Sequence, residues 1–209
     1  MIRVFLVDDH AVLRAGLSAM LESTGEMKVV GQAGDGNEAL NAEALLTCDV
    51  LVLDFSLPRI SGSEVLRRVR ARRPELPVLV LSMYPEDQLG LQVLRDGASA
   101  YLSKSRSPEE LLSAIRRIAR GGTYLTDTLA AQAAQGPRDK EAAPHAQLSP
   151  REHQVFMLLL QGRTASDIAA ELDLHSSTVS NNIRRIKEKL RVQTQGEIVA
   201  YGHRFGLIT

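Results

Sequence analysis

The sequence is poor in cysteine and in long apolar stretches. Cys48 is the only cysteine among 209 residues, which excludes an intramolecular disulfide and a cysteine metal cluster and leaves a small buried side chain as its expected role. The longest apolar runs, such as residues 155–160, are far shorter than the roughly 20 residues of a membrane-spanning helix. Since the chain goes directly into a predicted strand, we expect a cytoplasmic protein with no membrane partner.

The chain also lacks net charge, but its charges are unevenly distributed. Acidic and basic side chains nearly balance over residues 1–122, whereas basic side chains are in excess over residues 148–209. The excess is concentrated in residues 176–191, where Glu188 is the one acidic residue among Arg184, Arg185, Lys187, Lys189 and Arg191. Such a local cluster is typical of a surface that contacts a polyanion.

Short apolar runs alternate with helical patterns through residues 1–122. Strands are predicted at residues 2–7, 27–33, 50–54, 77–81 and 100–103. Helices are predicted at residues 11–21, 37–46, 63–73, 86–95 and 108–120. Because each strand is followed by a helix and a short link, we expect an α/β domain with a doubly wound, five-stranded parallel sheet.

Acidic residues stand directly after two of these strands. Asp54 ends the apolar run 50–53, and Asp8 and Asp9 end the first strand. The carboxyl ends of parallel strands form the edge at which open α/β sheets bind ligands. If the two strands are neighbours, three carboxylates converge there, and a cluster of oxygen ligands suits Mg²⁺. Taken alone, Asp54 would be interpreted as an acidic turn residue.

A wider pattern resembles the receiver domain of two-component signalling. It consists of Asp8-Asp9, Asp54 with Pro58 and Gly62, Ser82 at the end of PVLVLS, and Lys104 after GASAYLS. The resemblance covers residues 1–122 and implies that Asp54 accepts a phosphoryl group from a sensor histidine kinase. It further implies an Mg²⁺ site made by Asp8, Asp9, Asp54 and the backbone carbonyl of Ser56. The implied switch hydroxyl, switch aromatic and ion-pair partner of the phosphate are Ser82, Tyr101 and Lys104.

The predicted helix 63–73 carries five arginines, at positions 67, 68, 70, 72 and 73. Such a run suits a nucleic-acid surface. Arginine stems also cover apolar surface while their charged heads stay in water. We therefore favour a solvated helix face for this segment.

Residues 123–147 differ in composition from the rest of the chain. Large apolar residues become rare after Leu129, while Gly, Pro, Ala and charged residues accumulate. We expect a short helix in the first part and a flexible linker from Gln135 onward. The predicted organisation is a receiver domain at residues 1–122, a linker at 123–147 and a second domain at 148–209.

The second domain has the pattern of a helix-turn-helix. Ser149 and Pro150 form a helix start, and Thr164 or Ser166 is predicted to cap the next helix. A short link then leads into a helix that begins near Ser176 with small polar residues and continues through basic ones to residue 190. With a further helix at residues 197–201, we expect an all-α domain of four helices.

The segments LSPREHQVFMLLLQG and DIAAELDLHSSTVSNNIRRIKEKL resemble the LuxR-type domain of NarL/FixJ response regulators. This family usually has lysine where Ser180 stands, commonly histidine at Asn182, and often asparagine-lysine at Ala165-Ser166. These departures remove family contacts to phosphates. The resemblance implies DNA as the partner, and the helix that begins at Ser176 as the recognition helix.

The expected DNA contacts lie along that recognition helix. The predicted residues are Thr178, Val179, Ser180, Asn181, Arg184, Arg185, Lys187 and Lys189. Ser180, Asn181 and Arg184 form one stripe near the amino-terminal half and are predicted to face base edges. Lys187 and Lys189 lie further along and should meet phosphates. Val179 either packs in the domain or touches a thymine methyl.

The favoured hypothesis is a phosphorylation-controlled transcription factor and not an enzyme. Phosphorylation would act through a homodimer or through release of the DNA-binding domain, and the sequence leaves both open. One alternative is a phosphatase of the haloacid-dehalogenase type, which also uses a strand-end aspartate with Mg²⁺. Such enzymes carry a DxD arrangement, whereas Asp8 and Asp9 are adjacent and are followed by His10. A constitutive DNA-binding protein is the other alternative.

Overall fold

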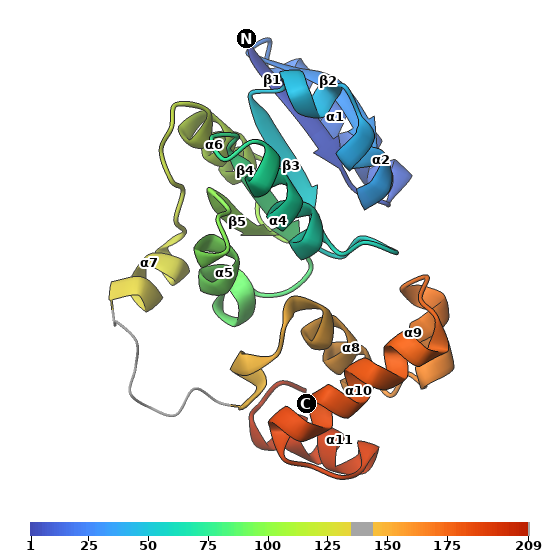
Figure 1. Ribbon diagram of the computed structural model, residues 1–209. Helices are drawn as coiled ribbons and strands as arrows, with labels where there is room; N and C mark the ends of the chain where they lie inside the picture. Colours follow the sequence, from blue (N-terminus) through green and yellow to red (C-terminus); the bar gives the residue numbers. More distant parts are fainter. Residues whose placement is uncertain (135–143, 209) are drawn as a thin grey trace. The chain divides into compact units, whose positions relative to one another are not determined.

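The computed structural model describes residues 1–134 and 144–208 (Figure 1). The chain divides into two compact units, Met1–Gly136 and Pro137–Thr209. Both ends of the predicted linker 123–147 are described, as helix α7 (Asp127–Ala134) and the 3₁₀ helix η1 (Pro144–Gln147). Residues 135–143, where flexibility was predicted, lie outside the described residues.

The first unit contains a five-stranded parallel sheet in the order β2-β1-β3-β4-β5. The strands are β1 (Ile2–Val7), β2 (Met27–Ala33), β3 (Val50–Asp54), β4 (Val78–Ser82) and β5 (Ala100–Ser103). Every residue of β3 and β4 is buried. A continuous apolar strand is stable in this position because helices cover both faces of the sheet. The predicted doubly wound α/β fold is confirmed.

Alternate residues of each strand contribute to two separate cores. On one face, helices α1 (Ala11–Ser23) and α6 (Pro108–Ala119) pack against Leu6 and Val52. On the other, α2 (Gly36–Asn41), α4 (Gly62–Arg72) and α5 (Glu86–Arg95) pack against Leu53 and Val80. This alternation follows from the two-residue period of a strand, and it leaves the carboxyl ends of the strands open to a site.

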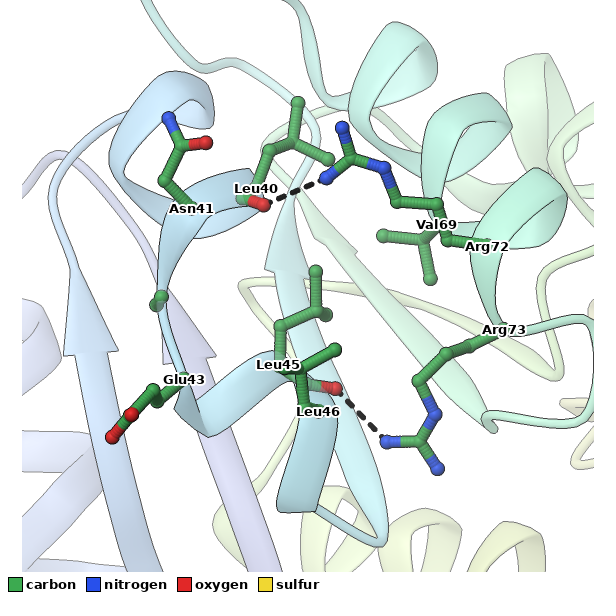
Figure 2. A pocket seen from close by; sticks show the side chains of 9 residues that line it. Leu40, Asn41, Glu43, Leu45, Leu46, Val69, Arg72 and Arg73 are labelled. Carbon is green, nitrogen blue, oxygen red and sulfur yellow. Dashed lines mark hydrogen bonds between the residues drawn. The ribbon is translucent and has the colours of Figure 1, made fainter.

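The single helix predicted at residues 37–46 was wrong. Ala42 has an extended backbone, with φ −73° and ψ 136°, and it separates α2 from the short helix α3 (Ala44–Thr47). Arg72, at the end of α4, and the following Arg73 reach across to the carbonyl oxygens of Leu40 and Leu45 (Figure 2). The two bonds are 2.8 and 2.9 Å long. The first bond satisfies a carbonyl at the end of α2, and the second satisfies a carbonyl near the end of α3.

The arginine run of α4 has two different roles. Arg67 and Arg68 form ion pairs with Glu64 on the same helix, as expected for a solvated face. Arg70, by contrast, donates from Nε to the carbonyl of Gly97 at 2.7 Å. Together with Arg72 and Arg73, it ties α4 to neighbouring segments. A pocket of about 260 Å³ remains beside the break, between α4 and the α2–α3 segment (Figure 2).

The second unit is a bundle of α8 (Pro150–Leu160), α9 (Ala165–Glu171), α10 (Ser176–Leu190) and α11 (Gln195–Arg204). Ser149 caps α8 and Thr164 caps α9, each in a reciprocal capping box with the acid three residues later. Asp173, in a left-handed conformation with φ 48°, lies in the turn between α9 and α10. The unit is therefore a helix-turn-helix with two flanking helices, as predicted.

In the part of the chain that the structure describes, every helix is too short or too polar to cross a bilayer. Cys48 is buried, as expected, and burial raises the pKa of its thiol to about 11. At neutral pH this thiol therefore stays protonated and unreactive.

Candidate functional site

The predicted acidic cluster forms at the carboxyl ends of β1 and β3. These two strands are hydrogen-bonded neighbours, so Asp8 and Asp54 lie side by side. Their side chains are almost completely buried. Lys104, in the loop after β5, places its Nζ 2.7 Å from Asp8 Oδ2 and 2.7 Å from Asp54 Oδ2. One ammonium group therefore bridges both carboxylates.

The remaining oxygen of each carboxylate accepts a backbone hydrogen bond. Asp8 Oδ1 accepts from the N–H of His10 at 2.8 Å, and Asp54 Oδ1 accepts from the N–H of Ser56 at 3.0 Å. Burial raises the pKa of Asp54, although Lys104 and the Ser56 N–H oppose this. Burial lowers the pKa of Lys104, but the two carboxylates outweigh it and hold that pKa above its ordinary value. Asp8, Asp54 and Lys104 are thus closely packed charges that are largely shielded from solvent.

Asp9 and His10 complete the cluster on its exposed side. One ligand atom from each of Asp8, Asp9, His10 and Asp54 lies within 4.8 Å of the others. His10 Nδ1 is 2.9 Å from Asp9 Oδ1. Sequence reasoning did not assign His10 to the site, although its position directly after the acidic pair was a signal. The three aspartates are the hard oxygen ligands that Mg²⁺ requires.

Gly62 allows the start of α4 to lie directly against the backbone of Asp54 and Phe55. A β-carbon at this position would lie 2.4 Å from the carbonyl oxygen of Asp54 and 2.7 Å from the Cα of Phe55. The N–H of Gly62 donates to the Phe55 carbonyl at 3.2 Å. The glycine of the receiver pattern is therefore needed because α4 begins against the end of β3.

The predicted switch residues are connected through Tyr84. Ser82 is fully buried at the end of β4, and its Oγ accepts a hydrogen bond from the N–H of Tyr84 at 3.2 Å. The buried Tyr101 donates from its hydroxyl to the carbonyl of Tyr84 at 3.0 Å. Sequence reasoning missed Tyr84, because its backbone rather than its side chain makes both contacts.

The predicted DNA-contacting residues of α10 fall into three groups. Thr178, Ser180, Asn181, Arg184 and Arg185 are exposed. Val179 is fully buried in the core of the second unit, so in this structure it packs and does not face a thymine methyl. Lys187 and Lys189 are half-buried.

Two of the basic side chains on α10 already have acidic partners. Lys189 Nζ lies 2.5 Å from Glu152 Oε2 and donates to the carbonyl of Gln147 at 3.0 Å. Arg184 Nη1 lies 2.6 Å from Glu188 Oε1, one turn further along the helix. Glu152 is buried, whereas Glu188 is exposed. Lys189 is therefore held against the start of α8, while Arg184 remains on the surface.

Comparisons with known proteins agree with both units. Residues 4–116 match the response regulator receiver domain, and residues 146–201 match the luxR family of bacterial regulatory proteins. Response regulator UvrY of Escherichia coli (strain K12) is 34% identical over 99% of this chain and 96% of its own length. Transcriptional regulatory protein LiaR of Bacillus subtilis (strain 168) is 31% identical over 100% of both chains.

Among solved structures, RcsB from Salmonella enterica serovar Typhimurium, bound to promoter P1flhDC in the presence of the phosphomimetic BeF₃⁻, matches with a TM-score of 0.67. That match has 25% identity and covers 96% of this chain and 97% of RcsB. The chain therefore belongs to the two-component response regulators with a LuxR-type DNA-binding domain. A receiver joined to such a domain is the architecture of a transcriptional regulator controlled by phosphorylation.

Proposed function

We propose that the protein receives a phosphoryl group on Asp54 from a sensor histidine kinase in the cytoplasm, and that this modification controls its binding to promoter DNA. The observation that most strongly supports the proposal is the Asp54 carboxylate itself. It is 1% exposed, lies at the end of β3 beside Asp8, and is paired with Lys104. The same chain carries a LuxR-type DNA-binding domain, which provides an output for the modification.

In the transfer step, one Asp54 oxygen forms a bond to phosphorus while the bond between phosphorus and the imidazole nitrogen of the donor breaks. The departing nitrogen keeps the bonding electron pair. Lys104 Nζ, 2.7 Å from Asp54 Oδ2, is positioned to neutralise charge on the transferred group. Because the ammonium is held by Asp8 as well, it does not have to be recruited from solvent.

The residues that would hold Mg²⁺ are Asp8, Asp9 and Asp54, with the backbone carbonyl of Ser56. Their fit is supported by the carboxylate oxygens, which lie within 4.8 Å of one another. When bound, Mg²⁺ supplies positive charge to the oxygens of the transferring phosphoryl group. Lys104 would then exchange part of its contact with Asp54 for the phosphoryl oxygens.

The response to the modification would pass through Ser82 and Tyr101. A phosphoryl oxygen on Asp54 attracts the Ser82 hydroxyl, which breaks the present contact between Ser82 and the N–H of Tyr84. Tyr101 is bonded to the carbonyl of the same residue, so the two contacts change together. We expect this rearrangement to favour a homodimer or to release the DNA-binding domain.

At the DNA, we propose that Ser180, Asn181 and Arg184 face base edges in the major groove. Thr178, Arg185 and Lys187 would contact phosphates. This assignment is supported by the exposure of Thr178, Ser180, Asn181, Arg184 and Arg185 on α10. Val179 is better explained as a core residue of the second unit, and Lys189 as the ion-pair partner of Glu152.

The experiment that tests the proposal compares wild type with Asp54→Asn. Both proteins are incubated with acetyl phosphate and Mg²⁺, and intact mass and promoter affinity are measured on the same samples. We expect wild type to gain the mass of one phosphoryl group and to bind DNA more tightly, and the asparagine variant to do neither, because an amide is not a nucleophile. An undiminished adduct on the variant would contradict the assignment of Asp54.

A further inference from the structure

Helix α7 packs along α5 through residues on one of its faces. Thr126, just before α7, and Leu129 and Gln132 within it are spaced three residues apart, which places them on the same side. Thr126 Oγ1 donates to Glu86 Oε2 at 2.5 Å. Gln132 Nε2 donates to the carbonyl of Asp87 at 3.1 Å. The first two residues of α5 therefore bind both ends of the segment 126–132, which we call the docked segment.

Between these polar contacts, Leu129 fills a notch in α5. Leu129 is fully buried and belongs to the same core as Leu89 and Tyr101. The notch exists because position 90 is glycine, where a β-carbon would lie 2.5 Å from Leu129 Cδ2. Burying a leucine side chain stabilises a contact by about 1.5 to 3 kcal/mol.

Glu86 joins the docked segment to the rest of the unit. Its carboxylate is buried and forms a two-point ion pair with Arg106, with Nε and Nη2 each 2.8 Å from one oxygen. Although burial acts to raise the pKa of Glu86, hydrogen bonds from Arg106 and Thr126 outweigh it and hold that pKa below its ordinary value. The ionised carboxylate thus ties together α5, the loop before α6 and the segment that begins α7.

This network is directly connected to the switch residues. Glu86 begins α5, two residues after Tyr84, which bonds both Ser82 and Tyr101 through its backbone. A change that turns the Ser82 hydroxyl toward a phosphoryl group would therefore displace the loop that positions Glu86. The Thr126 contact and the Gly90 notch would move with the amino-terminal part of α5.

The short length of α7 makes its structure dependent on docking. The helix has 8 residues, whereas isolated helices shorter than about 12 to 15 residues are marginal in water. Just before it, the N–H of Tyr124 donates to the carbonyl of Ser99 at 3.0 Å, and Tyr124 forms a bridge with Ala100 of β5. Undocking would therefore melt the chain from residue 125 onward while Tyr124 stays attached to the sheet.

We propose that α7 is a reversibly docked output helix, bound to α5 while Asp54 is unmodified and released and unfolded when Asp54 is phosphorylated. The inference rests on the proposed function and specifies its regulation. In the docked form the chain is held to α5 as far as Gln132, and in the released form the last anchored residue is Tyr124. Phosphorylation thereby changes the point at which the chain leaves the first unit, which changes how the DNA-binding unit is attached.

Hydrogen–deuterium exchange on the full chain tests the release. We expect the amides of residues 125–134 to exchange at least about tenfold faster after treatment with acetyl phosphate and Mg²⁺. In Asp54→Asn the same treatment should leave their exchange unchanged. Leu129→Ala should exchange fast before any treatment, whereas Ala130→Ser, on the exposed side of the same helix, should behave as wild type. Unchanged protection in protein that carries the phosphoryl group would overturn the inference.

A disulfide between α5 and α7 tests whether release matters for output. In Gly90→Cys with Leu129→Cys, a β-carbon at position 90 would lie 3.3 Å from the present Leu129 Cγ, which is one bond from the Cβ. Disulfide-bonded β-carbons are about 3.5 to 4.5 Å apart, so the bridge is within reach. Cys48 is 2% exposed and does not compete for the new thiols.

We expect the oxidised variant to accept the phosphoryl group without a gain in promoter affinity. The same protein under dithiothreitol has neither the disulfide nor Leu129 to hold α7, so it should bind promoter DNA more tightly than the oxidised form. Intact mass is measured on every sample. If the oxidised variant is phosphorylated and gains affinity as wild type does, the inference fails while the proposed function stands. If wild type itself forms no adduct, the proposed function fails and this inference fails with it.

Discussion

The two units each contain a lysine paired with a buried carboxylate, and the two pairs behave differently. In the first unit Lys104 lies 2.7 Å from Asp54, and in the second Lys189 lies 2.5 Å from Glu152. Both carboxylates are at most 3% exposed. The pKa of Asp54 is nevertheless raised, whereas the pKa of Glu152 is lowered.

The difference lies in the balance between burial and the groups bonded to each carboxylate. Burial acts to raise the pKa of Glu152, but hydrogen bonds from Lys189 and from Ser149 outweigh it. At Asp54 burial prevails, and the neighbouring Asp8 adds a like charge that competes for the same lysine. A carboxylate whose hydrogen bonds outweigh its burial is a structural element, whereas one in a crowded cluster where burial prevails is prepared to react or to bind a cation.

The largest effect on this comparison is expected when Lys104 is removed. Lys104→Met leaves two buried carboxylates side by side, so we expect the first unit to lose about 4 kcal/mol of unfolding free energy. Millimolar Mg²⁺ should restore much of that loss, because a cation between the carboxylates replaces the ammonium. Urea unfolding with and without Mg²⁺ measures both effects. A variant as stable as wild type in metal-free buffer would show that the acidic cluster is not under electrostatic stress.

Acid should weaken the second unit through a buried histidine. Burial lowers the pKa of His153 to about 4 from an ordinary 6.5. Above pH 6.5 both the folded and the unfolded states are neutral. Between pH 6.5 and about 4 only the unfolded state takes up the proton, so stability falls as the pH falls, by about 3 kcal/mol in total. Burial shifts the pKa of the nearby His145 in the same direction.

Denaturant unfolding at a series of pH values measures this dependence. His153→Gln, which has no ionisable group, should flatten most of the slope between pH 6.5 and 4. His203→Gln serves as the control, because His203 is exposed on α11. A slope that persists in the His153 variant would assign the acid sensitivity to other groups.

Removing the lysine from the second pair should have a smaller effect than removing Lys104. Lys189→Met leaves Glu152 with its capping bonds to Ser149, so we expect a loss of about 2 kcal/mol. Added Mg²⁺ should not restore it. The salt dependence of DNA binding should remain close to that of wild type, because Lys189 is engaged with Glu152. The measured slope is that of the logarithm of the DNA-binding constant against the logarithm of the salt concentration. If this slope became smaller in magnitude by about one unit, Lys189 would instead be a phosphate contact.

The smallest expected effect concerns the surface pair on α10. Arg184 shares its charge with the exposed Glu188, so Arg184→Ala should lower promoter affinity by about 1 kcal/mol, the low end for an arginine that reads a guanine. Affinity for a scrambled duplex should change less. Titrations of both duplexes at several salt concentrations measure the difference. Equal losses on the two duplexes would make Arg184 a phosphate contact.

Local sequence patterns were sufficient wherever a few neighbouring residues determine the outcome. The strand positions follow from short apolar runs, and the helix start at Ser149 follows from a side chain that satisfies an N–H group three residues later. For the next helix the sequence offered Thr164 or Ser166 as the cap, and the structure has Thr164. The strand-end aspartates were identified by the same logic, because the end of a parallel strand places its next side chain at the ligand-binding edge.

Contacts between distant residues were decided only by the tertiary structure. Glu86 and Thr126 are 40 positions apart, and Glu152 and Lys189 are 37 apart. The carbonyl of Leu40, at the end of α2, is bonded by Arg72, 32 positions further along the chain, and Val179 is buried because neighbouring helices cover it. Helical or strand periodicity describes one element at a time. The packing of the elements against one another determines which side chains remain available to a ligand and which are bound by a partner within the fold.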